Sequence, residues 1–344
     1  MEFGVFDHID SGTADISAFF EDRLRLAETY DRTGFYAYHI AEHHGTPLGF
    51  ASSPGIFLSA VAQRTRRLRM GPLVFILPLY HPLRLLDEIA MLDALSGGRL
   101  ELGIGKGISP YELKFFGLDP ATAAERFQET LEVLQQGFQS DRIDYTGKYF
   151  TFDGVPVQQH PVQKPHPPLW YGVIRPDSAA WAARNGMNII CGLGGADEMR
   201  GIADAYWGAW NGSVHPGRPQ PKVGMMRQIV VADTDAEALA IARRSHKQFR
   251  KSFLYLWGRN QDPLGEMLLP EDYDLVEQSG SALAGSPERV LKELSRQLAD
   301  AGRVNYLLCR FALGDQTHAE TVRSVELFAR DVMPALRESF AAAA

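Results

Sequence analysis

The densest group of polar side chains in the sequence is the segment His39–His44, with the letters HIAEHH. Three of its residues, His39, Glu42 and His43, form the pattern H-x-x-E-H, which binds zinc when a helix carries both histidines on one face. The preceding Gly34 is typical of a helix that has just ended, and the residues after it favour a strand. We therefore expect no zinc site here and predict no bound metal.

Two other interpretations of this segment remain. The histidines can be ordinary surface or hydrogen-bonded core residues, as a single histidine often is. Alternatively, Glu42, His43 and His44 stand at the carboxyl end of a barrel strand, which is where barrel enzymes build their active sites.

A second group, Leu100–Gly107, places glycines at every second position after a predicted strand, with Lys106 between the last two. Glycines here let a flat ligand or a phosphate approach the backbone, and Lys106 adds a positive charge. The spacing differs from the dinucleotide-binding fingerprint, so a tight turn explains the glycines equally well.

A third candidate lies at Tyr171–Ser178, where a strand leads into a helix. The amino end of a helix attracts anions, so a mononucleotide phosphate can sit at Ser178. Ordinary capping of the helix by Asp177 or Ser178 is the alternative.

Short apolar runs alternate with amphipathic segments along the chain, which is the pattern of a parallel sheet covered by crossover helices. Eight such units favour a closed (β/α)8 TIM barrel, an α/β fold, as one domain over residues 1–344. The candidate strands are Glu2–Phe6, Ala37–Ala41, Arg69–Ile76, Leu100–Ile104, Leu169–Val173, Asn188–Gly192, Lys222–Val231 and Asn305–Phe311.

Helical spacing is clearest at residues 16–27, 83–95, 121–138 and 178–184, and a final helix is expected over His318–Leu336. Two segments interrupt the alternation. Residues 141–168 predict a loop or hairpin, and residues 233–285, between strands seven and eight, predict the largest insertion and a possible lid. Its aromatic residues favour a core for the insertion helices over a cap on a substrate pocket; they are Phe253, Tyr255, Trp257 and Tyr273.

The composition narrows the class of ligand. The 344 residues are 45% hydrophobic and carry a net charge of −7 without a basic stripe, which argues against nucleic acid and leaves a small molecule as the expected substrate. No apolar run approaches membrane-spanning length, and no secretion signal is evident, so we expect a cytoplasmic protein that does not bind membranes. Cys191 and Cys309 lie in apolar runs and are predicted to be buried, inert thiols.

Three segments together resemble the α-subunits of bacterial luciferase and related monooxygenases, in order, spacing and identity. They are Ala41–His44, the stretch from Arg69-Met70-Gly71 through Ile76-Leu77-Pro78 to His81-Pro82, and Leu95–Gly105. The carboxyl-terminal Phe311–Pro334 is also similar to the end of this class. The resemblance covers essentially the whole chain and is weakest in the insertion.

The resemblance implies a barrel that binds reduced FMN at the carboxyl ends of its strands, adds O₂ to it and protects a hydroperoxyflavin from water. His44 corresponds to the family's catalytic histidine, with His43 and Glu42 as supports. Lys106 stands where luciferases have a phosphate-binding arginine, and Arg126 falls near a second one. The flavin ring is expected beside His44, and Leu73-Val74 is the candidate for the family's non-prolyl cis peptide. The remaining implied flavin contacts are Phe75, Ile76, Gly105, Gly107, Tyr171, Gly172 and Ser178.

The class also implies an NAD(P)H:flavin reductase as the source of reduced FMN, a small organic substrate and a homodimer. Gly105 replaces the reactive cysteine of luciferases, so light emission is not implied. Three alternatives stay open: a deazaflavin-dependent hydride transferase of the same fold, a non-catalytic flavin-binding protein, and a metalloenzyme built on the H-x-x-E-H segment.

Overall fold

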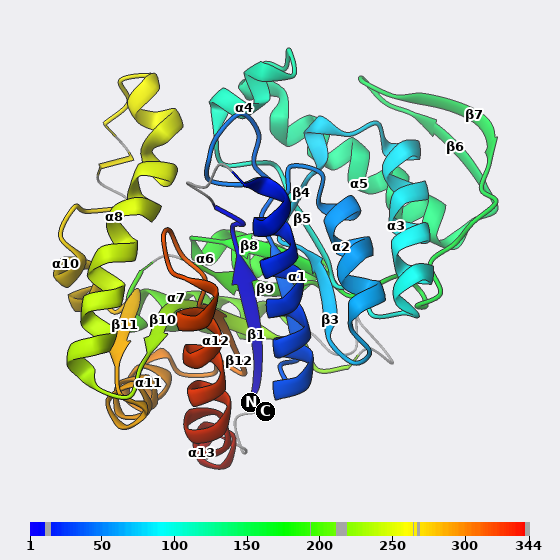
Figure 1. Ribbon diagram of the computed structural model, residues 1–344. Coiled ribbons are helices and arrows are strands. Elements are labelled where there is room, and N and C mark those ends of the chain that lie inside the picture. The colour runs from blue at the N-terminus through cyan, green and yellow to red at the C-terminus, as the bar shows by residue number, and fades with distance from the viewer. Residues whose placement is uncertain (11–14, 193, 211–218, 264, 267–268, 341–344) are drawn as a thin grey trace.

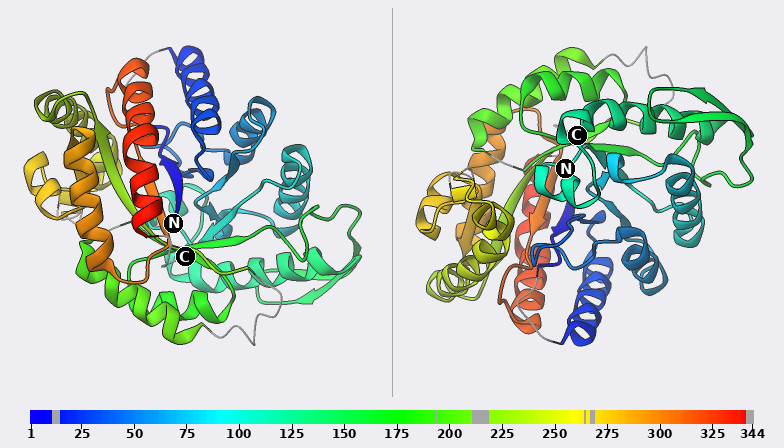
Figure 2. Two further views of the ribbon diagram at one scale, coloured as in Figure 1. Left: turned by 90° about the horizontal axis from the view of Figure 1, so that it is seen from below. Right: turned by 90° about the horizontal axis from the view of Figure 1, so that it is seen from above.

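Eight parallel strands form a ring at the centre of the computed structural model, which describes residues 1–10, 15–192, 194–210, 219–263, 265–266 and 269–340 (Figure 2). The ring closes between the third and fourth strands, where the amide of Met70 donates to Arg99 O at 3.0 Å and the amide of Glu101 donates to Met70 O at 2.8 Å. In chain order the ring strands are β1 (Glu2–Asp7), β2 (Ala37–Ile40), β3 (Arg69–Pro72), β5 (Leu102–Gly105), β8 (Leu169–Val173), β9 (Asn188–Cys191), β10 (Val223–Val231) and β12 (Tyr306–Arg310). The predicted (β/α)8 barrel is confirmed, and each predicted strand matches one of these within a few residues.

Helices surround this ring on its outer side (Figures 1 and 2). They are α1 (Ile16–Thr33), α2 (Pro54–Arg64), α3 (Pro82–Ser96), α5 (Ala123–Gln139), α6 (Pro176–Arg184), α7 (Ala196–Ala209), α11 (Pro287–Ala301), α12 (His318–Leu327) and α13 (Met333–Ser339). Left-handed glycines end α1 and α3: Gly34 has φ 84° and Gly97 has φ 67°. Glycine adopts this conformation without steric cost, which is why both positions marked helix ends in the sequence.

The carboxyl-terminal helix differs from the single helix expected over His318–Leu336. A π-helical turn, η3 (Phe328–Val332), separates α12 from α13. Pro334, at the start of α13, has no N–H to donate back to the preceding turn, so the regular hydrogen-bond ladder cannot run through this position.

Smaller elements decorate the barrel. The strand β4 (Phe75–Ile76) pairs with β5, and β11 (Ala282–Gly285) pairs with β10. Residues 141–168 contain the antiparallel hairpin β6 (Arg142–Thr146) and β7 (Thr151–Pro156), which projects from the barrel (Figure 1). Short helical segments are η1 (Leu77–Leu79), α4 (Pro110–Phe115) and η2 (Pro120–Thr122).

The insertion between β10 and β12 contains the long helix α8 (Asp235–Arg259) and the short helix α10 (Tyr273–Gln278). Most of its aromatic side chains form a core, as predicted: Tyr273 and Trp257 are buried, and Phe253 packs against the cluster. Tyr255 is the exception, because 41% of its surface is exposed. Among the described residues, no helix is both long and apolar enough to cross a membrane.

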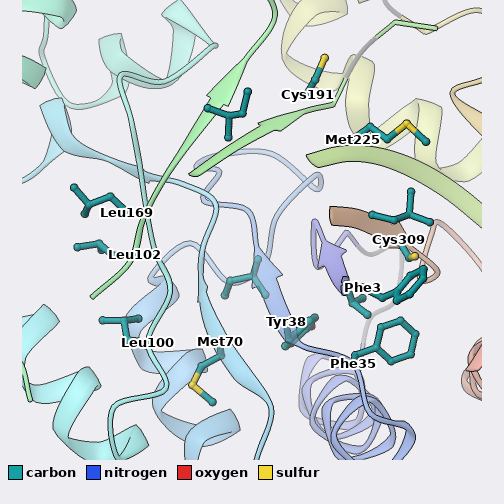
Figure 3. Close-up of a cluster of buried hydrophobic side chains, with 14 of the residues drawn as sticks. Phe3, Phe35, Tyr38, Met70, Leu100, Leu102, Leu169, Cys191, Met225 and Cys309 are labelled. Atoms are coloured by element: carbon teal, nitrogen blue, oxygen red, sulfur yellow. The ribbon is translucent and has the colours of Figure 1, made fainter. Parts of the chain in front are cut away.

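Side chains alternate between the two faces of each barrel strand. The outward-facing ones pack against the helices in the main core, which includes Phe3, Tyr38, Leu102 and Met225; Figure 3 shows Leu102 and Met225 on different sides of the ring of strands. Cys191 and Cys309 belong to this core, so the prediction of buried thiols is confirmed, and burial raises the pKa of Cys309.

Inward-facing side chains fill the lower half of the barrel, at the amino ends of the strands. The buried Glu101 carboxylate accepts hydrogen bonds from Tyr36 Oη at 2.7 Å, from Arg69 Nε and from Trp170 Nε1. Above it, Tyr306 Oη lies 3.3 Å from His39 Nε2. We call these residues, Tyr36, His39, Arg69, Glu101, Trp170 and Tyr306, the floor cluster; they close this end of the barrel.

Replacing Glu101 with Leu should lower the free energy of unfolding by about 3–5 kcal/mol, because Arg69 would keep a partly buried charge without its carboxylate. Urea unfolding followed by circular dichroism measures the change. Asp153→Asn is the control, since the Asp153 side chain is fully exposed and its loss should alter stability by less than about 0.5 kcal/mol. Equal stability of the two variants would contradict the role assigned to Glu101.

Candidate active site

The upper half of the barrel interior, at the carboxyl ends of the strands, is lined by glycines on one side. Trp170 points inward to the floor cluster, so Gly172, two residues further along β8, also faces the interior. A Cβ built on Gly172 would meet no atom within 4 Å, and one on Gly192 would meet only Met226 Cε, at 3.0 Å. These two positions leave room for a flat molecule above the floor.

The glycines of β5 have a different function, because the neighbouring segment approaches them closely. A Cβ on Gly103 would lie 2.2 Å from Pro72 O, and one on Gly105 would lie 2.5 Å from Val74 Cγ2. The peptide bond between Leu73 and Val74 is cis, as the resemblance implied. The glycines therefore allow the cis segment to lie directly against β5 at the rim of the open space.

His44 stands just beyond β2 with its ring held from two sides. Its Nε2 lies 2.8 Å from Glu42 Oε1, and the ring of Phe116 packs edge-on at 4.8 Å between centroids. The Glu42 side chain is almost completely buried, and its second oxygen accepts the amide of Ile76 at 2.8 Å. Glu42 thus fixes the orientation of His44, whose side chain remains 18% exposed.

Glu112, on the short helix α4, is a member of this site that the sequence analysis missed. Its Oε1 accepts the backbone amide of His44 at 2.7 Å and lies 3.2 Å from His43 Nδ1. The sequence Ser109-Pro110-Tyr111-Glu112 has the form of a capping box, which predicts a helix start and a glutamate turned back on its own helix. Ser109 does cap α4, but Glu112 holds the two histidines instead.

We call the open, carboxyl-end half of the barrel interior the mouth. Its wall opposite the glycines carries polar side chains from the ends of β1, β10 and β12 that the sequence analysis also missed. The ring of His8 stacks on that of His43 at 5.8 Å and contacts Phe249 of α8 at 5.4 Å. Burial and the nearby Arg310 guanidinium hold the pKa of His8 well below its usual value, so its ring is neutral at pH 7. Neither His8 nor Arg310 belongs to a recognisable motif, and only the closed ring brings them together.

Asp10 lies in the same wall, fully buried. Burial raises its pKa to about 7, although Arg23 opposes this shift. Its Oδ2 accepts the amide of Gly314 at 3.1 Å, which joins the loop after β1 to the loop after β12. Arg23 forms its ion pair with Asp7 instead, at 3.3 Å.

Three of the predicted cofactor contacts, including the phosphate contacts Lys106 and Ser178, follow β5 and β8, which are neighbours in the sheet. Lys106 is exposed, and Gly107 has a left-handed φ of 83°. The hydroxyl of Ser178 donates to Arg175 O at 2.7 Å in the first turn of α6, and the side chain of the N-cap residue, Arg175, makes no capping hydrogen bond to this helix.

Arg126, on α5, stacks its guanidinium 4.1 Å from the centre of the Tyr149 ring. Its Nε is buried and has no hydrogen-bond partner among the described residues. A buried donor without a partner costs free energy that a bound anion can recover.

Two predicted flavin contacts have side chains that face the helices and not the mouth. Phe75 is fully buried against Tyr80 at 5.4 Å, and Tyr171 packs on Trp181 at 5.0 Å. Only the backbone of these two positions can reach a ligand inside the barrel.

The H-x-x-E-H segment does not form the helix that a zinc site requires. His39 belongs to β2 and points into the floor cluster, where burial lowers its pKa to about 3. Across the described ranges, no group of three or more His, Cys, Asp or Glu side chains is arranged to hold a metal ion.

The sequence profile described as luciferase-like monooxygenase matches residues 1–304. The chain belongs to this family. The resemblance seen in the sequence is thereby confirmed, and the luciferase-like chain is an oxidoreductase whose relatives are named monooxygenases.

Relatives of this luciferase-like chain include the uncharacterized protein y4wF of Sinorhizobium fredii, 43% identical over 92% of this chain and 91% of that one. The oxygenase component of the flavin-dependent trigonelline monooxygenase of Acinetobacter baylyi is 25% identical over 78% of this chain and 75% of that one. Among solved structures, the oxygenating constituent of 3,6-diketocamphane monooxygenase from Pseudomonas putida, in complex with FMN, superposes with a TM-score of 0.80 at 21% identity, covering 97% and 98% of the two chains. This last similarity supports the fold.

Asp10→Asn should remove one component of the pH dependence of stability. An unfolded aspartate loses its proton near pH 4, whereas folded Asp10 keeps it until about pH 7. The protonated Asp10 carboxyl therefore contributes its full share of the free energy of unfolding below pH 4. The wild type loses this stability as the pH rises to 7, by up to about 1.4 kcal/mol per pH unit.

Urea unfolding of the wild type and Asp10→Asn at pH 4 to 8 measures this difference. The free energy of unfolding of the variant should rise relative to that of the wild type between pH 4 and 7, and the difference should stay constant above pH 7. Asp153→Asn should follow the wild type throughout, and parallel curves for Asp10→Asn and the wild type would refute the assignment.

Proposed function

We propose that this chain is the oxygenase of a two-component monooxygenase, which uses reduced FMN and O₂ to oxygenate a small organic substrate through a hydroperoxyflavin. The observation that carries the proposal is the glycine-lined opening above the floor cluster, with His44 held at its rim by Glu42. Membership in the luciferase-like family supports the same reaction class.

The residues of the mouth fit a flavin. We assign the flavin ring to the space beside the cis peptide, against Leu73, Val74, Gly105 and Gly172. Ile76 lies next to this space, where its amide donates to Glu42. Because the floor cluster closes the barrel below, a ring bound here is shielded from water on that side.

The FMN phosphate is assigned to the rim outside β5 and β8. Lys106 and Arg126 supply positive charge, Gly107 allows close approach of the backbone, and the amino end of α6 at Ser178 adds the positive end of a helix dipole. The donor of Arg126 without a partner is the feature of this rim that most directly fits an anion.

His44 is the residue we assign to proton exchange with the bound flavin. If Nε2 donates to the Glu42 carboxylate at 2.8 Å, Nδ1 is the nitrogen that can accept or return a proton. Glu112 supports this arrangement by accepting the His44 amide and by contacting His43. His43 and Glu42 therefore act as positioning residues.

The partners follow from the reaction class. The trigonelline relative is named an oxygenase component, which supports a separate NAD(P)H:flavin reductase as the source of reduced FMN here. We also propose that the protein is cytoplasmic and, as the family resemblance implies, a homodimer, with the insertion as a lid region over the mouth.

His44→Ala should slow substrate oxygenation by about 100-fold or more, because a positioned acid–base group contributes roughly 10²–10⁴ in rate. The measurement is rapid mixing of the reduced FMN complex with O₂ while the flavin absorbance is recorded, with product analysed after the addition of candidate substrates. His160→Ala is the control, since His160 lies outside the barrel and pairs with Asp141. An unchanged rate in His44→Ala would remove it from the mechanism.

The same assay separates the proposal from its alternatives. Titration with FMN, reduced FMN and a deazaflavin identifies the cofactor, and a long-lived oxygen adduct of the reduced flavin supports the monooxygenase. Tight binding of deazaflavin alone, without an oxygen reaction, would assign the chain to hydride transfer. Binding of FMN without any reaction would indicate a non-catalytic flavin-binding protein.

The double variant Lys106→Ala/Arg126→Ala should weaken FMN binding by about tenfold or more while leaving riboflavin binding unchanged, because riboflavin lacks the phosphate. Fluorescence titration with both ligands measures the two affinities. Lys292→Ala, an exposed lysine on α11, is the matched control. An equal loss for FMN and riboflavin would move the phosphate site elsewhere.

A further inference from the structure

We propose that Arg310 binds a carboxylate on the substrate, so that the oxygenated molecule is a small organic acid. This inference rests on the proposed function, because it assigns the wall of the mouth that faces the flavin site. It specifies a substrate class and a residue that selects it.

Arg310 is the last residue of β12 and points into the barrel. Tyr306 belongs to the floor cluster, and Leu308 packs in the same interior group, so alternation places Arg310 on that face one level higher. Its register partner on β10 is Gln228, whose Oε1 accepts a hydrogen bond from Arg310 Nη2 at 3.3 Å. Arg310 therefore stands in the mouth and above the floor.

The guanidinium is charged and forms no ion pair with a carboxylate of the described residues. Burial lowers the pKa of Arg310 to about 10, which still leaves it protonated at pH 7. It lies 4.5 Å from the centre of the Phe249 ring, and its buried Nε has no hydrogen-bond partner within the described ranges. Arg23 and Arg69 each form an ion pair with a buried acid. Arg227 of β10 is buried without an ion pair in the described structure and donates to Gln297 Oε1 at 2.6 Å and Met226 O at 2.8 Å.

Asp10 and Asp7 both act electrostatically on this charge, but neither forms an ion pair with Arg310 in the described structure, and Asp7 pairs with Arg23. One Asp10 oxygen accepts the Gly314 amide, and the raised pKa of about 7 leaves the carboxyl partly protonated near neutral pH. A buried cation without a full counter-charge favours an anionic ligand.

Two further polar atoms beside Arg310 are buried and unpartnered in the described structure: Gln228 Nε2 and His8 Nδ1. A carboxylate has two oxygens, which can accept from Arg310 Nε and from Gln228 Nε2 together. Phe249 covers this group with an apolar surface, so the remainder of the ligand can be a hydrocarbon or an aromatic ring.

The position of His8 gives the ligand a direction. Its ring lies between Arg310 and His43. Glu112 contacts His43 and accepts the amide of the next residue, His44. A substrate with its carboxylate at Arg310 would extend past His8 toward His44 and the flavin. The atom that is oxygenated then lies away from the carboxylate.

Isothermal titration of the flavin-free protein tests this proposal with benzoate, phenylacetate and hexanoate as carboxylate probes and benzamide as the neutral analogue of benzoate. At least one carboxylate should bind the wild type, and benzoate should bind about tenfold or more tightly than benzamide. Arg310→Gln should abolish carboxylate binding, and Arg310→Lys should retain part of it, since lysine keeps the charge without the fork of donors.

Arg303→Gln is the matched control, because Arg303 also stacks on an aromatic ring, Trp207 at 4.4 Å, but is exposed outside the barrel. It should bind the probes as the wild type does. If Arg310→Gln fails to fold by circular dichroism, Gln228→Leu replaces it and should weaken carboxylate binding several-fold.

The proposal is overturned if none of the carboxylates binds the wild type, if benzamide binds as tightly as benzoate, or if the Arg310 or Gln228 variant retains full carboxylate affinity. Because these titrations contain no flavin, their outcome is independent of the oxygen reaction. Failure of the wild type to react with O₂ would contradict the proposed function and leave the carboxylate site standing.

Discussion

The buried carboxylate of Glu101 determines at which end of the barrel a ligand can bind. The carboxylate accepts hydrogen bonds from Tyr36, Arg69 and Trp170, and these side chains form one layer across the barrel interior. The layer closes the barrel at the amino ends of the strands. A charge buried this deeply is stable only when its partners surround it, so the layer cannot open to admit a ligand. The interior that this layer leaves free lies at the carboxyl ends of the same strands.

At that end, residue size and polarity divide the mouth into two walls. On β5, β8 and β9 the inward positions are glycines, which make space for a flat ring and let the cis segment approach. On β1, β10 and β12 the equivalent positions carry His8, Gln228 and Arg310. The helix α8 reaches this second wall through Phe249. One wall therefore suits a cofactor, and the other can select a substrate.

Much of this architecture could be predicted from the sequence, because strand and helix patterns are local. The eight strands, the helix ends at Gly34 and Gly97, and the cis position at Leu73-Val74 all agree with the structure. The π-helical turn could not be predicted by period alone, since the hydrophobic spacing continues through it and only Pro334 marks the break.

The candidate site was only partly predictable for the same reason. Glu42, His43 and His44 are consecutive and form a visible motif, whereas Glu112 joins them across 68 positions of sequence. His8 and Arg310 come from opposite ends of the chain and meet because β1 pairs with β12. Ring closure is a tertiary property, and a pattern along the chain does not show which strand ends will face each other.

The barrel direction also sets how this protein can be joined to another. The strand β1 begins at the floor with Glu2, and α13 returns to the same end after running down the outside of the barrel (Figure 1). A reductase linked at either of these points would sit beneath the closed layer and not beside the mouth. Reduced flavin released by such a fused partner would have to travel around the barrel through solvent, so direct channelling would require a linker long enough to reach the opposite rim.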